Sequence, residues 1–283
     1  MRVTQILGYN PRKFWESWYR RVGFHEGASL SAHNNYEDCK AYYKCIEDFL
    51  RAYLDPYRVK ENVYVCDIGA GTGHFTDFCI ENVSGACVYA LEICDFAVKQ
   101  LETKYAGLNV VVLRGDISNF ELPSMFHVIL AIGLLHHIVK DEDFERALVN
   151  IRKALRDDGV LFVTSTFVDK KFWGVLRKDF RFPRGIYKKY RSWEKWEAAL
   201  DRANLRAWKV HTLEVPASSR WLPNAALVLR KRGSEERQER SLKDTLSESL
   251  NCSGRSAHKR KWIKNAMFVS SDPRAHPRSR LVL

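Results

Sequence analysis

The glycine-rich stretch Asp67-Ile-Gly-Ala-Gly-Thr-Gly73 is the clearest candidate for chemistry in this sequence. The short apolar run Val63–Ile68 precedes it, and the apolar-periodic segment Phe75–Ile80 follows it. A strand, a glycine turn and a helix in this order present a nucleoside-like ligand at the carboxyl ends of parallel strands. Glycine serves there because a β-carbon would obstruct a tight turn or a close backbone contact with the ligand. The stretch therefore predicts a nucleoside-type site.

Two common nucleotide motifs do not fit this turn. The dinucleotide fingerprint G-x-G-x-x-G, counted from Gly69, requires glycine where His74 stands, which disfavours a dehydrogenase. The P-loop requires a Gly-Lys pair, and the sequence contains none. The alternate glycines after Asp67 instead resemble the first motif of class I S-adenosylmethionine-dependent methyltransferases.

Four later motifs continue this resemblance in the family's order. Glu92 ends the apolar run Ala86–Glu92, where an acid can accept hydrogen bonds from both ribose hydroxyls. Gly115-Asp116-Ile117 follows the next apolar run. His127–Ile138 resembles the fourth strand with its loop, and Leu155–Thr164 resembles a helix-end turn with the fifth strand. Five motifs in order are far more specific than one glycine turn.

The resemblance implies a Rossmann-like, doubly wound α/β domain. Its seven-stranded sheet is expected to be mostly parallel, with an antiparallel last strand and helices on both faces. The implied cofactor is S-adenosyl-L-methionine: Asp67 would support the turn and the cofactor's amino group, Glu92 would hold the ribose, and Asp116 the adenine. The expected cofactor-binding residues are Asp67, Gly69, Ala70, Gly71, Gly73, Glu92, Ile93, Asp116, Ile117 and Gly133.

His136 and His137, at the end of the fourth motif, are the candidate catalytic residues. Methyl transfer is an in-line displacement, and its barrier falls mainly through positioning the nucleophile and excluding water. A hydroxyl or amine acceptor also benefits from a general base, and histidine titrates near neutral pH. We therefore expect His137 first, and His136 second, to act as the base. Loop packing or shaping of the cofactor site is the alternative role.

Hydrophobic periodicity predicts the elements that must position these residues. The expected helices are Pro11–Val22, Asn35–Leu54, Gly73–Asn82, Asp95–Tyr105, Asp141–Leu155 and Ser192–Ala203. The expected strands are Val63–Ile68, Ala86–Ile93, Val110–Arg114, Val128–Ile132, Val160–Thr166, Leu205–Val215 and Asn224–Leu229. Gly159 is expected to break the helix before the fifth strand.

The sequence divides into three expected parts. Residues 1–35 form an N-terminal lid segment with an aromatic, amphipathic helix, and residues 36–232 form the methyltransferase domain. Within the domain, residues 167–191 contain nine Lys+Arg against two Asp, interleaved with aromatic residues. This segment is expected to cap the substrate, where it could hold an acidic aromatic substrate or stack on single-stranded nucleic acid. A solvated surface helix is the alternative.

Residues 233–283 are expected to form a basic, disordered tail, because they contain few hydrophobic residues. The net charge of the chain is +12, but residues 230–283 alone hold 14 Lys+Arg against 6 Asp+Glu. The basic excess is therefore concentrated in the tail, and the whole-chain charge is no argument for a nucleic-acid enzyme. A weak nucleic-acid contact through the tail remains open.

Cysteine usage and hydropathy indicate the compartment. The seven cysteines form no C-x-x-C pair and mostly lie in apolar runs, which favours reduced thiols over disulfides or a zinc site, so no metal is expected. We find no signal-peptide core and no apolar run near the ~20 residues of a membrane helix. A cytoplasmic protein without a membrane partner is expected.

Three functions are consistent with these patterns. The first is a methyltransferase acting on a small-molecule acceptor, favoured by the Leu-His-His-Ile loop and the aromatic segments flanking the core. The second acts on RNA or protein, although Ala131-Ile-Gly-Leu134 stands where base-amino methyltransferases carry Asn-Pro-Pro-Tyr. The third is a non-catalytic, methyltransferase-like binding protein, which the intact cofactor motifs disfavour.

Overall fold

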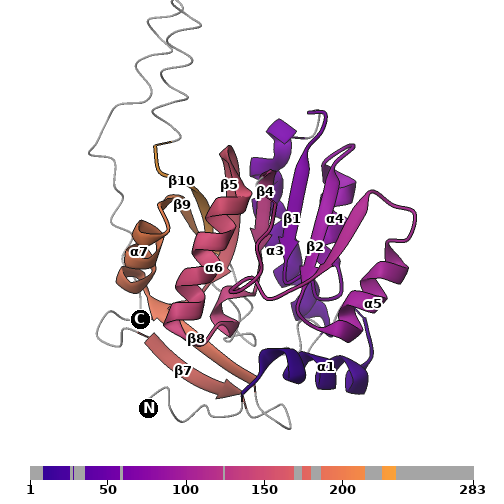
Figure 1. Cartoon of the computed structure of the whole chain (residues 1–283), viewed down its shortest axis with the longest axis horizontal. Coiled ribbons are helices and arrows are strands. Elements are labelled where there is room, and N and C mark those ends of the chain that lie inside the picture. The colour runs from indigo at the N-terminus through magenta and orange to yellow at the C-terminus, as the bar shows by residue number, and fades with distance from the viewer. Residues whose placement is uncertain are drawn as a thin grey trace, which may run out of the picture. The chain divides into compact units, whose positions relative to one another are not determined.

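The computed structural model describes residues 9–25, 28, 36–57, 60–123, 125–168, 174–179, 186–213 and 225–233 (Figure 1). The chain divides into two compact units, residues 1–234 and 235–283, and every described residue lies in the first. The predicted tail beyond Gly233 and the predicted cap Asn35 lie outside the described residues. Within these ranges, no helix combines the length and the apolar character that crossing a membrane requires.

The main sheet has seven strands in the order β3-β2-β1-β4-β5-β10-β9. The strands are β1 Tyr64–Ile68, β2 Cys87–Glu92, β3 Val110–Arg114, β4 Phe126–Ala131, β5 Leu155–Ser165, β9 Leu205–Thr212 and β10 Ala225–Lys231. β10 runs antiparallel to both β5 and β9, whereas the pairs among β1–β5 are parallel. The predicted fold class is thus confirmed. The strand order reverses between β1 and β4, and ligands of such sheets bind at that switch point.

The helices agree with the sequence prediction to within a few residues. They are α1 Pro11–Val22, α3 Tyr36–Leu54, α4 His74–Asn82, α5 Asp95–Lys104, α6 Asp141–Ala154 and α7 Trp193–Arg202, with 3-10 turns η2 Asp55–Tyr57 and η3 Leu135–His137. The predicted cap of α7 is present, since the Ser192 hydroxyl accepts a hydrogen bond from the Lys195 amide.

Alternate residues of the strands supply two hydrophobic cores, because successive side chains of a strand point to opposite faces. On β1, Cys66 and Ile68 pack in the core that contains Phe144 of α6 and Trp196 of α7. Val65 belongs to the opposite core, with apolar side chains of α3 and α4. Both faces are covered, so the carboxyl edge of the sheet remains as the place for a site.

The expectation for Gly159 is wrong. Helix α6 ends at Ala154, and β5 begins at Leu155, so Gly159 lies within the strand. The pairing of β4 with β5 shifts register between Phe126 and Val128. A β-carbon on Gly159 would lie 2.9 Å from the carbonyl oxygen of Phe126. Glycine is therefore required by close backbone packing at this irregularity.

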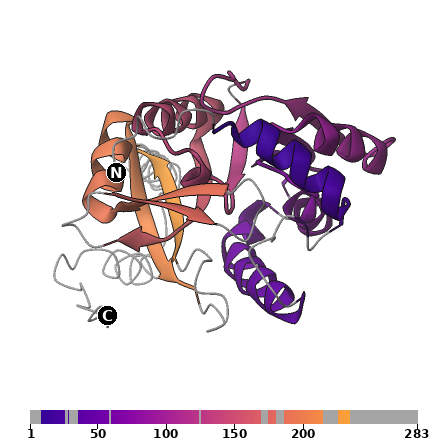
Figure 2. The same ribbon diagram turned by 90° about the horizontal axis from the view of Figure 1, so that it is seen from below.

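The described parts of residues 167–191 form strands and not the surface helix considered as an alternative. Where this segment is described, it forms a small sheet in the order β6-β8-β7, with β6 Phe167–Val168, β7 Gly174–Asp179 and β8 Ile186–Ser192. Ile186, Lys188 and Tyr190 are buried at alternate positions of β8, as a strand requires. Figure 1 shows the small sheet and α1 below the main sheet, and Figure 2 shows them from that side.

Candidate active site

The glycine turn connects β1 to α4 at the switch point. Gly69, Gly71 and Gly73 have φ angles of 77°, 57° and 87°, in the left-handed region that favours glycine. The amides of Gly69 and Ala70 donate to the Leu91 carbonyl at 2.7 and 3.1 Å, which fixes the turn against β2. Gly69, Ala70 and Gly71 line a cavity of ≈ 610 Å³. This volume falls within the range of about 300–1,000 Å³ that is typical of small-molecule sites.

Gly73 serves the turn differently, because it does not line the cavity. A β-carbon there would collide with the Tyr105 hydroxyl, whose oxygen lies 2.9 Å from both of its possible acceptors, the Gly73 carbonyl and Asp77 Oδ1. We expect Gly73→Ala to lower the free energy of unfolding in urea by the left-handed penalty of about 1–2 kcal/mol and by a further 1–3 kcal/mol for the collision. Gly85→Ala is the matched control: its φ is 69°, but a β-carbon there meets nothing within 4 Å. Equal losses in the two variants would contradict the collision.

Glu92 stands at the carboxyl end of β2 and lines the cavity with only 5% of its surface exposed. Its Oε2 accepts from the Gly71 amide at 2.9 Å, and its Oε1 accepts from the amides of Ile93 and Cys94 at 2.9 Å each. Burial raises the pKa of Glu92, while these three amides oppose that shift. A carboxylate offers about four acceptor positions, so one remains for a hydroxyl donor in the cavity.

Asp116 and Ile117 line the same cavity after β3, and Gly133 lines it after β4. Asp116 Oδ1 accepts from the Ser118 amide at 2.9 Å, which orients the carboxylate and leaves Oδ2 without an assigned contact. Gly133 has a φ of 66°, and a β-carbon there would enter open space. The ends of β2, β3 and β4 thus present two carboxylates and an exposed glycine backbone to one cavity. This set of acceptors fits an adenosine moiety, one ribose hydroxyl of which can use the remaining acceptor position of Glu92.

Asp67 does not line the cavity, although it was expected to support the cofactor's amino group. It is 2% exposed, and its Oδ2 accepts from the Thr76 hydroxyl at 2.8 Å. Burial raises the pKa of Asp67 to about 7. Its side chain therefore braces the turn by joining β1 to α4, while its contact with the cofactor stays a prediction.

His136 and His137, here called the histidine pair, lie on η3 directly after β4 and line the cavity. Burial lowers the pKa of His137 to about 3 and that of His136 well below its usual value, so both rings are neutral at pH 7. Among the residues that the structure describes, Nδ1 of each ring is buried without a hydrogen-bond partner. The other nitrogen of His137 bonds the Tyr187 main chain, an interaction that favours the protonated ring. That bond makes Nε2 the donor and leaves Nδ1 as a free acceptor.

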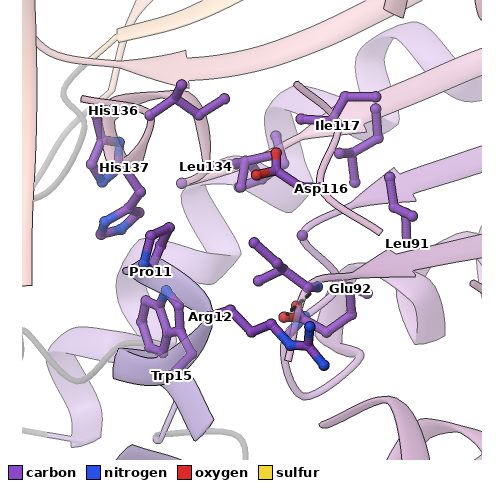
Figure 3. Close-up of a pocket in the computed structure, with 18 of the residues that line it drawn as sticks. Pro11, Arg12, Trp15, Leu91, Glu92, Asp116, Ile117, Leu134, His136 and His137 are labelled. Carbon is purple, nitrogen blue, oxygen red and sulfur yellow. Dashed lines mark hydrogen bonds between the residues drawn. The ribbon is translucent and has the colours of Figure 1, made fainter. Parts of the chain in front are cut away.

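Figure 3 shows how the cavity divides. His136, His137 and Trp15 lie together at one end, and Glu92 and Asp116 lie toward the other. Trp15 meets the His137 ring edge-on, with centroids 5.6 Å apart. Both predicted catalytic residues and all the predicted cofactor residues except Asp67 and Gly73 thus line one cavity.

Helix α1 is fastened across this cavity, a feature that the sequence alone did not reveal in detail. Glu16 Oε2 accepts from the Phe96 amide at 2.9 Å, in the first turn of α5, where a helix favours negative charge. Arg12 pairs with Asp95 in the same turn. Four residues of α1, from Pro11 to Tyr19, line the cavity. The amphipathic pattern of α1 predicted a packed helix, but no local signal named Glu16 as its anchor.

Arg191 was also missed, because it lies in a run of basic residues. It is 1% exposed, and its guanidinium donates to Asp141 Oδ1 at 3.0 Å and to the Ile138 carbonyl at 2.8 Å. The guanidinium also lies 4.0 Å over the Phe144 ring. A charge at this depth is tolerated because it is paired and hydrogen-bonded. Arg191 thereby ties β8 to the loop that follows the histidine pair.

The comparisons agree with this architecture. Residues 65–159 match a family model described as a methyltransferase domain. The chain is similar to a solved S-adenosylmethionine-dependent methyltransferase from Leishmania major, with 17% identity, a TM-score of 0.61 and coverage of 80% of this chain and 88% of that one. It is also similar to the 1,6-didemethyltoxoflavin-N1-methyltransferase of Burkholderia thailandensis, with 19% identity, a TM-score of 0.56 and coverage of 79% and 91%. A search of curated protein sequences finds no match.

The strand order, with its glycine turn and acidic strand ends at the switch point, defines the class I methyltransferase fold. With the family match over residues 65–159, this part of the chain is identified as a methyltransferase domain of the class I S-adenosylmethionine-dependent type. It is an enzyme of that class, and S-adenosylmethionine is its cofactor. The cofactor supplies a methyl group on a positively charged sulfonium.

Proposed function

We propose that the enzyme transfers the methyl group to a small-molecule acceptor that binds at the histidine end of the cavity. The observation that carries this proposal is the single cavity of ≈ 610 Å³ shared by the cofactor residues and the histidine pair, with α1 fastened across it. A small molecule fits behind such a helix more readily than a folded macromolecule. The Burkholderia enzyme, whose structure holds 1,6-didemethyltoxoflavin, has the same fold.

His137, and secondarily His136, would act as the general base for a hydroxyl or amine acceptor. The free Nδ1 of His137 supports this role, because it can accept the acceptor's proton. In the same proposal α1 serves as the lid, and the small sheet caps the acceptor. Both elements exclude water from the reacting atoms, which lowers the barrier for the displacement.

Two further expectations belong to this proposal: a cytoplasmic location and a nucleic-acid contact through the basic tail. Five cysteines are free thiols, which supports a reducing, cytoplasmic setting: Cys45, Cys66, Cys79, Cys87 and Cys94. A nucleic-acid contact through the basic tail falls outside the described residues and remains a prediction from charge alone.

The proposal is tested by following a radiolabelled methyl group. The purified full chain is incubated with labelled S-adenosylmethionine and, separately, with a metabolite extract, total RNA and a protein extract. Label is expected in the metabolite fraction and is expected to disappear when Glu92→Gln replaces the wild type. Label in RNA or protein, with none in the metabolites, would reject the small-molecule acceptor.

A further inference from the structure

Helix α5 takes a capping group from another helix. Cys94 occupies its N-cap position, where serine, threonine, aspartate and asparagine are preferred because their oxygens accept from the amides of the first turn. In this protein Glu16 of α1 supplies such an oxygen, since its Oε2 accepts from the Phe96 amide at 2.9 Å. A carboxylate on α1 thus completes the first turn of α5.

Glu16 is held by further donors in this position. Its Oε2 also accepts from the Cys94 thiol at 3.2 Å, and its Oε1 accepts from Arg20 of α1 at 2.9 Å. Burial alone would raise the pKa of Glu16, but the hydrogen bonds from the Phe96 amide, the thiol and Arg20 lower it, so the group is a carboxylate at neutral pH. Burial raises the pKa of the Cys94 thiol to about 12, so the thiol keeps the proton that it donates.

Cys94 connects this carboxylate to the cofactor site. Its thiol donates to Glu16, while its amide donates to Glu92 Oε1 at 2.9 Å. The Ile93 amide donates to the same oxygen of Glu92. Residues 93–96 therefore hold the α1 carboxylate on one side and the carboxylate of the cofactor site on the other. A shift of this segment would move two of the three amides that orient Glu92.

The same segment joins α1 to the wall of the cavity. Pro11, Arg12 and Trp15 of α1 line the cavity (Figure 3), and Arg12 also pairs with Asp95. Glu16 itself is not among the described residues that line the cavity. Its effect on a bound ligand must therefore pass through the groups that it holds.

We propose that Glu16 is a positioning residue for the cofactor, which holds residues 94–96 so that α1 stays closed and Glu92 stays oriented toward the ribose. This inference concerns retention of the cofactor and goes beyond the proposed acceptor, which takes no part in it. Because one segment holds both α1 and Glu92, opening of the lid and loosening of the ribose contact occur together. Loss of the Glu16 contacts then speeds release of the ligand, whereas entry into an open cavity is unchanged.

Stopped-flow binding of S-adenosylhomocysteine measures both rates. Glu16→Ala removes the accepting oxygens and introduces a good helix former, and it is expected to raise koff at least tenfold while kon stays within threefold. Glu16→Gln is expected to raise koff less, because its carbonyl oxygen can still accept from the Phe96 amide. Glu102→Ala is the matched control: it removes an exposed carboxylate of α5 and is expected to change neither rate.

Hydrogen exchange supplies a readout that a general loss of stability does not reproduce. In the wild type, S-adenosylhomocysteine is expected to slow exchange in α1 and in residues 93–96 together, at least fivefold in each. In Glu16→Ala, the ligand is expected to leave exchange in α1 unchanged. Strands β1 and β4 are expected to exchange as in the wild type, since Glu16 does not contact them.

A koff within twofold of wild type in a folded Glu16→Ala protein would overturn the proposal, as would a loss of affinity that lies wholly in kon. If this variant does not fold, exchange in the wild type decides: slowing in only one of the two segments, α1 or residues 93–96, would show that they are not coupled. Failure of the proposed small-molecule function would look different, since it appears in the methyl-label assay, and neither measurement here contains an acceptor.

Discussion

Glu92→Gln is expected to weaken the binding of S-adenosylhomocysteine at least tenfold, a loss of about 1.4 kcal/mol or more. The buried carboxylate accepts three amide hydrogen bonds and retains one position for a ribose hydroxyl. A glutamine has one acceptor oxygen, and its amide group would oppose a backbone donor such as the Gly71 amide. The variant therefore loses both the ribose contact and part of the hydrogen bonding that holds the turn. Calorimetry of the purified variant measures the loss.

Urea unfolding of the same variant separates binding from stability. Glu121→Gln is the control, because it removes the same charge from a carboxylate that is 79% exposed and pairs only loosely with Lys153. We expect this control to bind S-adenosylhomocysteine like the wild type. Affinity within twofold of wild type in folded Glu92→Gln would show that the carboxylate does not hold the ribose.

His137→Ala is expected to lower kcat about 100-fold or more with any accepted substrate, in the usual range for loss of a general base. Its affinity for S-adenosylhomocysteine is expected to stay within threefold, because the histidine pair lies at the other end of the cavity. His136→Ala is expected to reduce kcat less, since His137 alone bonds the Tyr187 main chain. Steady-state rates combined with calorimetry give both quantities.

His127→Ala is the matched control for the loss of a histidine. His127 is also 5% exposed and lies on β4, but it accepts from the Tyr64 amide and does not line the cavity. This variant is expected to be less stable, yet to turn over like the wild type when folded. If His137→Ala and His136→Ala both stay within twofold of wild-type turnover, neither histidine is the base.

The sequence predicted the structure well where a local residue pattern is compatible with only one local conformation. Short apolar runs predicted the strands of the main sheet, and the glycine turn and the acids at strand ends predicted the cofactor end of the site. The small sheet could not be predicted in the same way, because Lys188 and Arg191 occupy buried positions where a strand pattern calls for apolar residues. Their burial depends on partners far away in the chain, such as Asp141 for Arg191. Gly159 was misread because its backbone contact with Phe126 crosses between two strands.

The contact of Arg191 with Asp141 also bears on protein engineering. Acceptor preference is commonly altered by exchanging one segment between related enzymes, and residues 167–192 would be the obvious cassette. A graft that removes Arg191 would leave Asp141 without its buried guanidinium and would release the Ile138 carbonyl. The loop behind the histidine pair would then lose its attachment to the new cassette. A stable chimera must therefore take residues 138–141 and residues 167–192 from the same parent enzyme.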